Sequence, residues 1–321
     1  MTGMTGGQEA EMGNATEMGN AGKIGGIGEM GEMEKTAPAT EKRSNILRWA
    51  LIVLYGLAVV IFVGYANVAP TMILIVGFVF MLLHAPRRYG WKSTVVFMAL
   101  AFAISTILED ISIHTGFPFG KYHYNSVIGN IDRVPFAVGI IYISVSYLSW
   151  SLGSLILNRA DRHLNKKLNI VALPAASAFI MCQFDLVIDP ITSTYRNAWV
   201  WENGGGFFGV PLVNFLGWYL TCYIFMQLFA LYLAKRQNSQ PNVPEIQSRQ
   251  YWLQPIALYV LICVGYVAQY ASNYANTAQI VDMAGNVWVV GNRFETAVTV
   301  MIFTMAYSAM LALANPFRPS A

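Results

Sequence analysis

Long apolar stretches alternate with short polar connections from about residue 46 to the end of the chain. Eight of these stretches can each form a helix of roughly 17 to 25 residues, the length that crosses a lipid bilayer. They cover residues 46–64, 69–85, 93–111, 135–157, 170–188, 211–234, 254–271 and 295–314. The pattern therefore predicts an all-α, polytopic integral membrane protein with about eight transmembrane helices, a multi-pass protein of the cell membrane.

The N-terminal part of the chain follows a different pattern. It repeats Gly, Met, Glu, Asn and Thr, and it contains no aromatic residue and no long apolar run. Such a composition is typical of disorder. Gly26, Gly28 and Gly31 have the spacing of a dinucleotide-binding loop, but no strand precedes them and no helical pattern follows, so we reject that interpretation. The expected parts are a disordered cytoplasmic tail (1–44), a transmembrane helical domain (45–316) and a short cytoplasmic C-terminus (317–321).

Lys and Arg residues are concentrated in every second connection. The N-terminal tail and alternate connections carry 16 of them, and the other connections carry the remaining four, Lys121, Arg133, Arg196 and Arg293. Because cytoplasmic loops collect positive charge, this asymmetry predicts that both termini are cytoplasmic. Only 12% of the residues are charged, compared with about 25% in soluble domains. Membrane lipid is therefore an expected partner, and nucleic acid is not.

Acidic residues gather on the opposite, outer side. Glu109 and Asp110 end the third predicted helix, and Asp185 and Asp189 end the fifth. Asp185 and Asp189 are four residues apart and share a helix face. Two carboxylates on one face repel each other, so we expect one to keep a proton and to act as an acid. A single acid at a helix end can instead complement the helix terminus, but four ionisable residues near the ends of spans favour a function.

The two outer connections that follow these acids are long and rich in aromatic residues, Gly and Pro. Their tryptophans and tyrosines can stack on a substrate or face a cation, although an aromatic belt at the membrane surface is the alternative. The candidate substrate-binding residues are Tyr122, Tyr124, Trp199, Trp201, Glu202, Asn214 and Trp218. The histidines form no HxxxH or HExxH motif and the three cysteines lie in apolar runs without CxxC spacing, so no metal site is expected.

Two long motifs resemble those of a known family. The first is Glu109 followed by GFPFGKYHYN from Gly116 to Asn125, with Val134-Pro135 after it. The second contains DLVIDP from Asp185, WVWENGG from Trp199 and FFGVPLVNFLGW from Phe207. Both resemble the carotenoid biosynthesis membrane proteins that include bisanhydrobacterioruberin hydratase and the γ-carotene 1',2'-hydratases.

The resemblance implies a hydro-lyase without a cofactor. Such an enzyme adds water to the terminal isopropylidene double bond of an acyclic carotenoid, lycopene-derived or C50, and forms a tertiary alcohol. Protonation of this alkene gives a tertiary carbocation, so the site needs an acid, a wall that tolerates a cation, and a positioned water. We expect Asp185 or Asp189 to be the acid, Glu109 or Asp110 to position and deprotonate water, and Trp199, Trp201 or Trp218 to face the cation, with Asn214 adding polar contacts.

Two other functions stay open at this point. A cofactor-free carotenoid cyclase starts with the same protonation but must exclude water. A carotenoid carrier or proton-coupled transporter would use the acids for binding, and it would need polar residues that continue to the inner side, where few are evident. For the enzyme we expect a groove between helices that opens sideways to the bilayer and ends beneath the outer loops, and other carotenoid biosynthesis enzymes as partners.

Overall fold

The computed structural model describes residues 39–61, 68–125, 130–131, 133–239 and 248–315. The chain divides into two compact units, Met1–Arg43 and Ser44–Ala321. Residues 1–38 and 317–321 lie outside the described residues, as does the predicted disorder of the tail. The first helix begins at Ala39, so residues 39–44 are helical, which moves the predicted boundary of the tail.

Helices make up most of the second unit. They are α2 (Ala39–Ile61), α3 (Val68–Thr115), α4 (Phe136–Ile156), α5 (Asn169–Asp189), α6 (Leu212–Ser239), α7 (Arg249–Asn273), α8 (Val290–Met301) and α9 (Tyr307–Ala314). Short 3-10 or π-helical segments are η1 (Ala160–Arg162), η2 (Pro190–Tyr195) and η3 (Ile302–Ala306), and η3 joins α8 to α9. Seven helical segments of the described chain are long and apolar enough to cross a membrane.

The helix α3 accounts for the difference between seven segments and the predicted eight. Its 48 residues would make a rod of about 72 Å, more than twice the thickness of the ~30 Å hydrocarbon core of a bilayer. The chain breaks at Gly90, where φ is 74° and ψ is 160°, a conformation outside the helical region that glycine adopts readily. The two halves are separate membrane-length helices, so the prediction of an all-α membrane protein with about eight such helices is confirmed.

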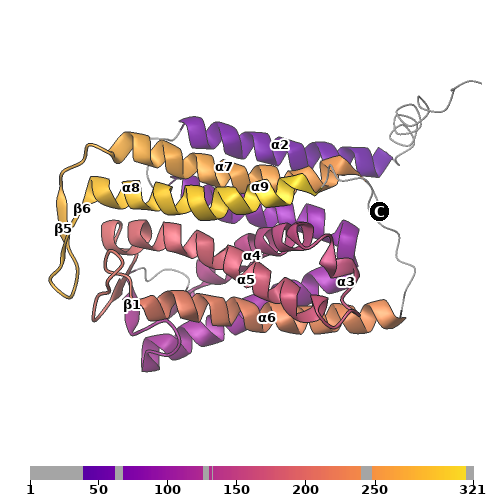
Figure 1. Cartoon of the computed structure of the whole chain (residues 1–321), viewed down its shortest axis with the longest axis horizontal. Coiled ribbons are helices and arrows are strands. Elements are labelled where there is room, and N and C mark those ends of the chain that lie inside the picture. Colours follow the sequence, from indigo (N-terminus) through magenta and orange to yellow (C-terminus); the bar gives the residue numbers. More distant parts are fainter. Residues whose placement is uncertain (1–38, 62–67, 126–129, 132, 240–247, 316–321) are drawn as a thin grey trace, which may run out of the picture. The chain divides into compact units, whose positions relative to one another are not determined.

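Hydrogen bonds gather alternate connections at one end of the second unit. The pairs are Asn45 with Gln250 at 2.7 Å, Arg236 with the Tyr89 carbonyl at 2.8 Å, the Leu164 amide with Gln237 at 3.2 Å, and Asn315 with Asn158 at 3.2 Å. This end holds the connections that are rich in Lys and Arg (Figure 1). Its location on the cytoplasmic side of the membrane stays a prediction.

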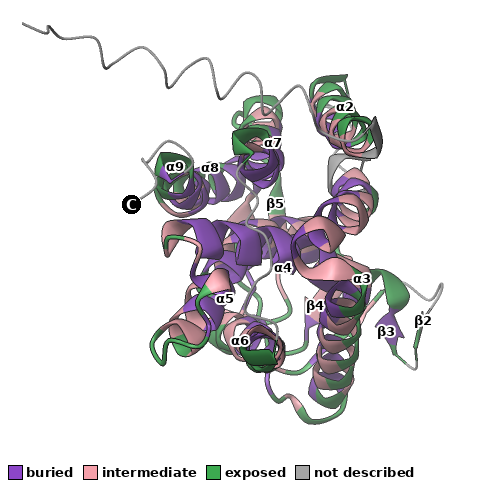
Figure 2. Ribbon diagram, turned by 90° about the vertical axis from the view of Figure 1, so that its right-hand side faces the viewer, coloured by how far each residue is buried: buried purple, intermediate pink, exposed green. Residues whose placement is uncertain are grey.

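Four helices surround the centre of the unit. The second half of α3 packs on α4 and α6, and α5 packs on both α4 and α6, so these four helices close a ring. The helix α4 also contacts α7 and α9, and every residue from Tyr142 to Leu155 is buried (Figure 2). A helix that is apolar on all sides is expected to be enclosed in this way. The acids lie at the outer ends of α3 and α5, which are two helices of this ring.

Six short strands lie in the outer connections. They form three antiparallel pairs: β1 (Tyr122–Tyr124) with β4 (Trp199–Trp201), β2 (Asn130–Ile131) with β3 (Val134–Pro135), and β5 (Gln279–Val281) with β6 (Val287–Val289). The β1–β4 pair joins the two aromatic-rich connections, with Tyr122 opposite Trp201 and Tyr124 opposite Trp199. We call this pair the aromatic ribbon.

Candidate active site

Glu109 is buried near the outer end of α3 and is held by three tyrosine hydroxyls. Tyr122 and Tyr124 donate to Oε2, the latter at 3.0 Å, and Tyr142 on α4 donates to Oε1 at 3.0 Å. A carboxylate has about four acceptor positions, so one remains for another donor. Three donors stabilise the ionised form of Glu109.

The two ribbon tyrosines keep their protons. Burial, and after it the charge of Glu109, raise the pKa of Tyr122 and of Tyr124 well above the ordinary value for tyrosine. Both side chains are therefore hydrogen-bond donors at neutral pH, as the contacts with Glu109 require.

Asp185 and Asp189 lie together on α5, as their spacing predicts. Both carboxyl groups are buried and within hydrogen-bonding reach of each other. The Asn214 amide on α6 donates to both, at 3.0 Å to Asp185 and 2.6 Å to Asp189. One oxygen of each carboxyl group has no donor among the described residues. Two carboxyl groups in this position cannot both be ionised, so the pair can hold a shared proton.

Glu109 and Asp189 both line one cavity beneath the aromatic ribbon. This cavity has about 50 Å³ of space open to the centre of a water molecule, enough for roughly three to five waters. It is lined by Glu109, Tyr122, Tyr124, Val138, Ile141, Phe184, Ile188, Asp189, Trp199, Trp201, Asn214 and Trp218. Its walls are mostly apolar, and the Trp218 ring stacks on Tyr142 with centroids 4.4 Å apart. The cavity lies beneath the outer loops, where we expect the groove to end, and an opening of this cavity towards lipid stays a prediction.

Two predicted site residues, Asp110 and Glu202, lie outside the cavity. Asp110 follows Glu109 on α3, yet its side chain is 36% exposed and lies 3.6 Å from the His114 ring nitrogen. Successive helix residues point about 100° apart, so only one of the two acids can face the bundle. Glu202 is 41% exposed and pairs with Lys121 at 3.2 Å. Neither residue lines the cavity.

Tyr142 is a site residue that the sequence analysis missed. It lies inside the apolar run of α4, where the sequence analysis assigned no candidate site residue. A usable signal was present, because a tyrosine buried in a membrane helix needs a partner for its hydroxyl. Within the described part of the chain, no three His, Cys, Asp or Glu side chains are grouped as a metal site.

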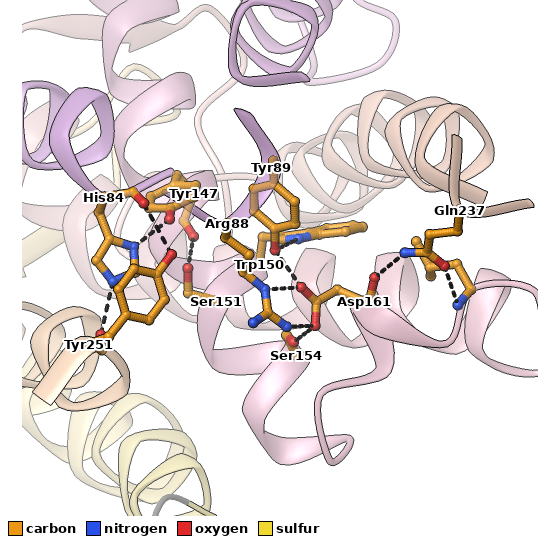
Figure 3. A network of polar contacts seen from close by, with 11 residues as sticks. His84, Arg88, Tyr89, Tyr147, Trp150, Ser151, Ser154, Asp161, Gln237 and Tyr251 are labelled. Atoms are coloured by element: carbon orange, nitrogen blue, oxygen red, sulfur yellow. Dashed lines mark hydrogen bonds and ion pairs between the residues drawn. The ribbon is translucent and has the colours of Figure 1, made fainter. Parts of the chain in front are cut away.

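A second polar network, at the opposite end of the bundle, was also missed (Figure 3). Arg88 makes a bidentate ion pair with Asp161 in the connection between α4 and α5, and Ser154 and Tyr89 also donate to Asp161. Burial alone would raise the pKa of Asp161, but Arg88 and these hydrogen bonds hold it below its ordinary value. The expectation of few polar residues on the inner side was therefore wrong, although these groups are paired with one another.

His84 belongs to the same region of the bundle. Its ring contacts the Tyr147 hydroxyl at 2.5 Å and the Tyr251 carbonyl at 2.9 Å, and it stacks on the Tyr251 ring. These contacts tie α3 to α4 and α7. We interpret the whole network as a clamp that fixes the inner ends of the helices.

The glycine run after the ribbon has a steric role that the structure explains. A Cβ atom on Gly205 would collide with the backbone of Val210 and Pro211, whereas one on Gly206 would meet nothing within 4 Å. We expect Gly205→Ala to lower the free energy of unfolding by about 1–3 kcal/mol through overpacking, and Gly206→Ala to leave it unchanged. Thermal unfolding in detergent measures both; equal melting temperatures for the two variants would contradict this role.

Comparisons with known proteins agree with the motifs. A family model described as carotenoid biosynthesis protein matches residues 69–284. Bisanhydrobacterioruberin hydratase from Haloarcula japonica is 30% identical over 125 residues, which cover 38% of this chain and 40% of that protein. The aligned region therefore spans less than half of the curated relative. No solved structure matches the chain.

Proposed function

Because this chain belongs to the carotenoid biosynthesis protein family, we propose that it adds water to the terminal isopropylidene double bond of an acyclic carotenoid. One observation supports the proposal: Asp189, which can share a proton with Asp185, and Glu109, which three tyrosines hold, line the same small aromatic cavity. Acid and base are thus available within one enclosed space, as a hydration requires.

In the first step the aspartate pair acts as the acid. Asp189 lines the cavity and Asp185 does not, so Asp189 delivers the shared proton. The alkene π electrons form the new C–H bond at the less substituted carbon. The positive charge then lies on the carbon that carries the two methyl groups, and the faces of Trp199, Trp201 and Trp218 stabilise it.

In the second step Glu109 acts as the base. A water molecule donates one hydrogen bond to the acceptor position that the three tyrosines leave open, and its oxygen forms the C–O bond with the cation. Glu109 takes the proton that the oxygen releases. Transfer of this proton back to the aspartate pair restores the starting state, so the net change is one alkene and one water converted into one tertiary alcohol.

Product mass tests the proposed function directly. We expect expression in a bacterial host that makes lycopene, or in a second host that makes bisanhydrobacterioruberin, to yield pigments heavier by one water per modified end. The Glu109→Gln protein, expressed to the same level, serves as the control and should leave the pigment unmodified. Pigment of unchanged mass but altered absorption would identify a cyclase, and unmodified pigment in both hosts would contradict the proposal.

A further inference from the structure

The aromatic ribbon separates two cavities. Side chains alternate across a strand, so Tyr122, Tyr124, Trp199 and Trp201 share the face that covers the acid cavity. His123 and Val200 are opposite each other on the ribbon and line a second cavity, which we call the outer pocket. Trp199 and Trp201 line both cavities. The wall between them is thus a single pair of strands.

The outer pocket is larger than the acid cavity and more polar. It has about 350 Å³ open to the centre of a water molecule. The polar side chains that line it are those of His123, Asn125, Ser193, Thr194, Asn197 and Asp282. The hydroxyl of Ser193, on η2, donates to the backbone carbonyl of Asp189 at 2.7 Å. The outer pocket therefore reaches within one helical turn of the residue that faces the acid cavity.

The two tryptophans of the wall are held differently. Trp201 is 4% exposed, and its indole N–H donates to the Phe119 carbonyl at 3.0 Å. Trp199 is only partly buried, and its indole N–H has no hydrogen-bond partner among the described residues; its ring contacts Tyr124 edge-on, with centroids 5.9 Å apart. Trp199 is therefore the part of the wall that can move at the lower cost.

We propose that the outer pocket supplies the water that is consumed in the reaction, and that Trp199 is the residue past which this water enters the acid cavity. The inference rests on the proposed hydration. Lipid can deliver the carotenoid but not the water, which must come from an aqueous surface, and the outer pocket is the polar space next to the acids. Entry past a single side chain also limits the number of water molecules beside the cation. This number determines whether the cation is captured by water or loses a proton.

A reversible block of the outer pocket tests the route. The three native cysteines are buried, at 8%, 0% and 6% exposure for Cys182, Cys222 and Cys263, so a Val200→Cys protein offers one accessible thiol. We expect a charged methanethiosulfonate reagent to label this thiol in the folded, detergent-purified protein and to slow hydration by about tenfold or more. Carotenoid should stay bound, as measured by co-elution, and dithiothreitol should restore the rate.

Val287→Cys is the matched control, because Val287 is an exposed strand residue of the outer side that does not line the outer pocket. Its labelling should leave hydration unchanged. Complete labelling of Val200→Cys with an unchanged rate, or with loss of bound carotenoid, would overturn the inference. Failure of the proposed function looks different, because the unlabelled wild-type protein would then not hydrate carotenoid at all.

A competition between water and methanol for the cation tests the role of Trp199 itself. In water containing methanol, we expect Trp199→Ala to give a larger share of methyl ether relative to tertiary alcohol than the wild type, because the smaller side chain admits the larger molecule. Val287→Ala, at an exposed position that lines neither cavity, should leave the ratio unchanged. Since both products come from folded, active protein, the ratio does not depend on the yield of the variant, and an equal ratio in Trp199→Ala and wild type would overturn the role of Trp199.

Discussion

The Asp189→Asn protein is expected to hydrate carotenoid about a thousandfold more slowly than the wild type, within the range typical for loss of a positioned acid. Asparagine has nearly the same size as aspartate, so the packing of α5 against α6 is preserved. It cannot share a proton with Asp185, however, and so it cannot protonate the alkene. Initial rates of alcohol formation, measured with purified protein and separated by chromatography, give the ratio.

Asp110→Asn is the matched control, because it removes a carboxylate near the same end of the bundle that does not line the cavity. Its rate should equal that of the wild type. Asp185→Asn should also be slow, since Asp185 is the other half of the pair that holds the proton. If the Asp189 variant kept the wild-type rate while its melting temperature was unchanged, the assignment of the acid would be wrong.

The Asp161→Asn protein is expected to lose about 3–5 kcal/mol of unfolding free energy, the cost of leaving one member of a buried ion pair alone. Arg88 would keep its charge in a buried position, where Asp161 is its ion-pair partner. For a domain of this size the melting temperature should fall by roughly 10 °C. Thermal unfolding in detergent, followed by circular dichroism, measures the change.

Lys121→Gln provides the contrast, because it breaks an ion pair whose side chains are 52% and 41% exposed. Exposed pairs contribute about 0–1 kcal/mol, so its melting temperature should barely change. Equal melting temperatures for the Lys121→Gln and Asp161→Asn proteins would contradict the clamp.

The pKa of Asp161 is lowered by folding. The contribution of Asp161 to the free energy of unfolding is therefore present at neutral pH, and it is lost as the pH falls through the lower pKa of the folded state.

The clustering of acids could be predicted from the sequence because charge in a membrane helix is costly. The four-residue spacing of Asp185 and Asp189 predicts that both lie on one helix face. The Asn214 amide donates to both, which is consistent with this shared face. The choice between Glu109 and Asp110 could not be predicted in the same way. Apolar residues surround both positions on α3, so periodicity gave no direction for the buried face.

The aromatic ribbon explains why Glu202 lies outside the cavity. A pattern with aromatic residues at every second position, as in Tyr122 and Tyr124 or Trp199 and Trp201, is typical of a strand with one buried face. Glu202 directly follows Trp201, so alternation directs it away from the cavity. Recognition of the strands would have excluded this residue.

The ion pair of the clamp, between Arg88 and Asp161, could not be predicted from local sequence patterns. Arg88 looked like part of a positively charged turn and Asp161 like an isolated acid in a loop, and each reading fits its neighbours in the chain. Their pairing depends on how the break at Gly90 and the α4–α5 connection meet in space. Long-range contacts of this kind leave no periodic signal in the sequence.

The aromatic ribbon also constrains the order of events during biosynthesis. Its first strand is synthesised before α4 and α5, and its second strand only after both. Until the second strand is made, the cavity next to Glu109 lacks the part of its lining that Trp199 and Trp201 provide. The cavity is therefore completed only after the segment around Trp199 has been synthesised and has paired with the first strand.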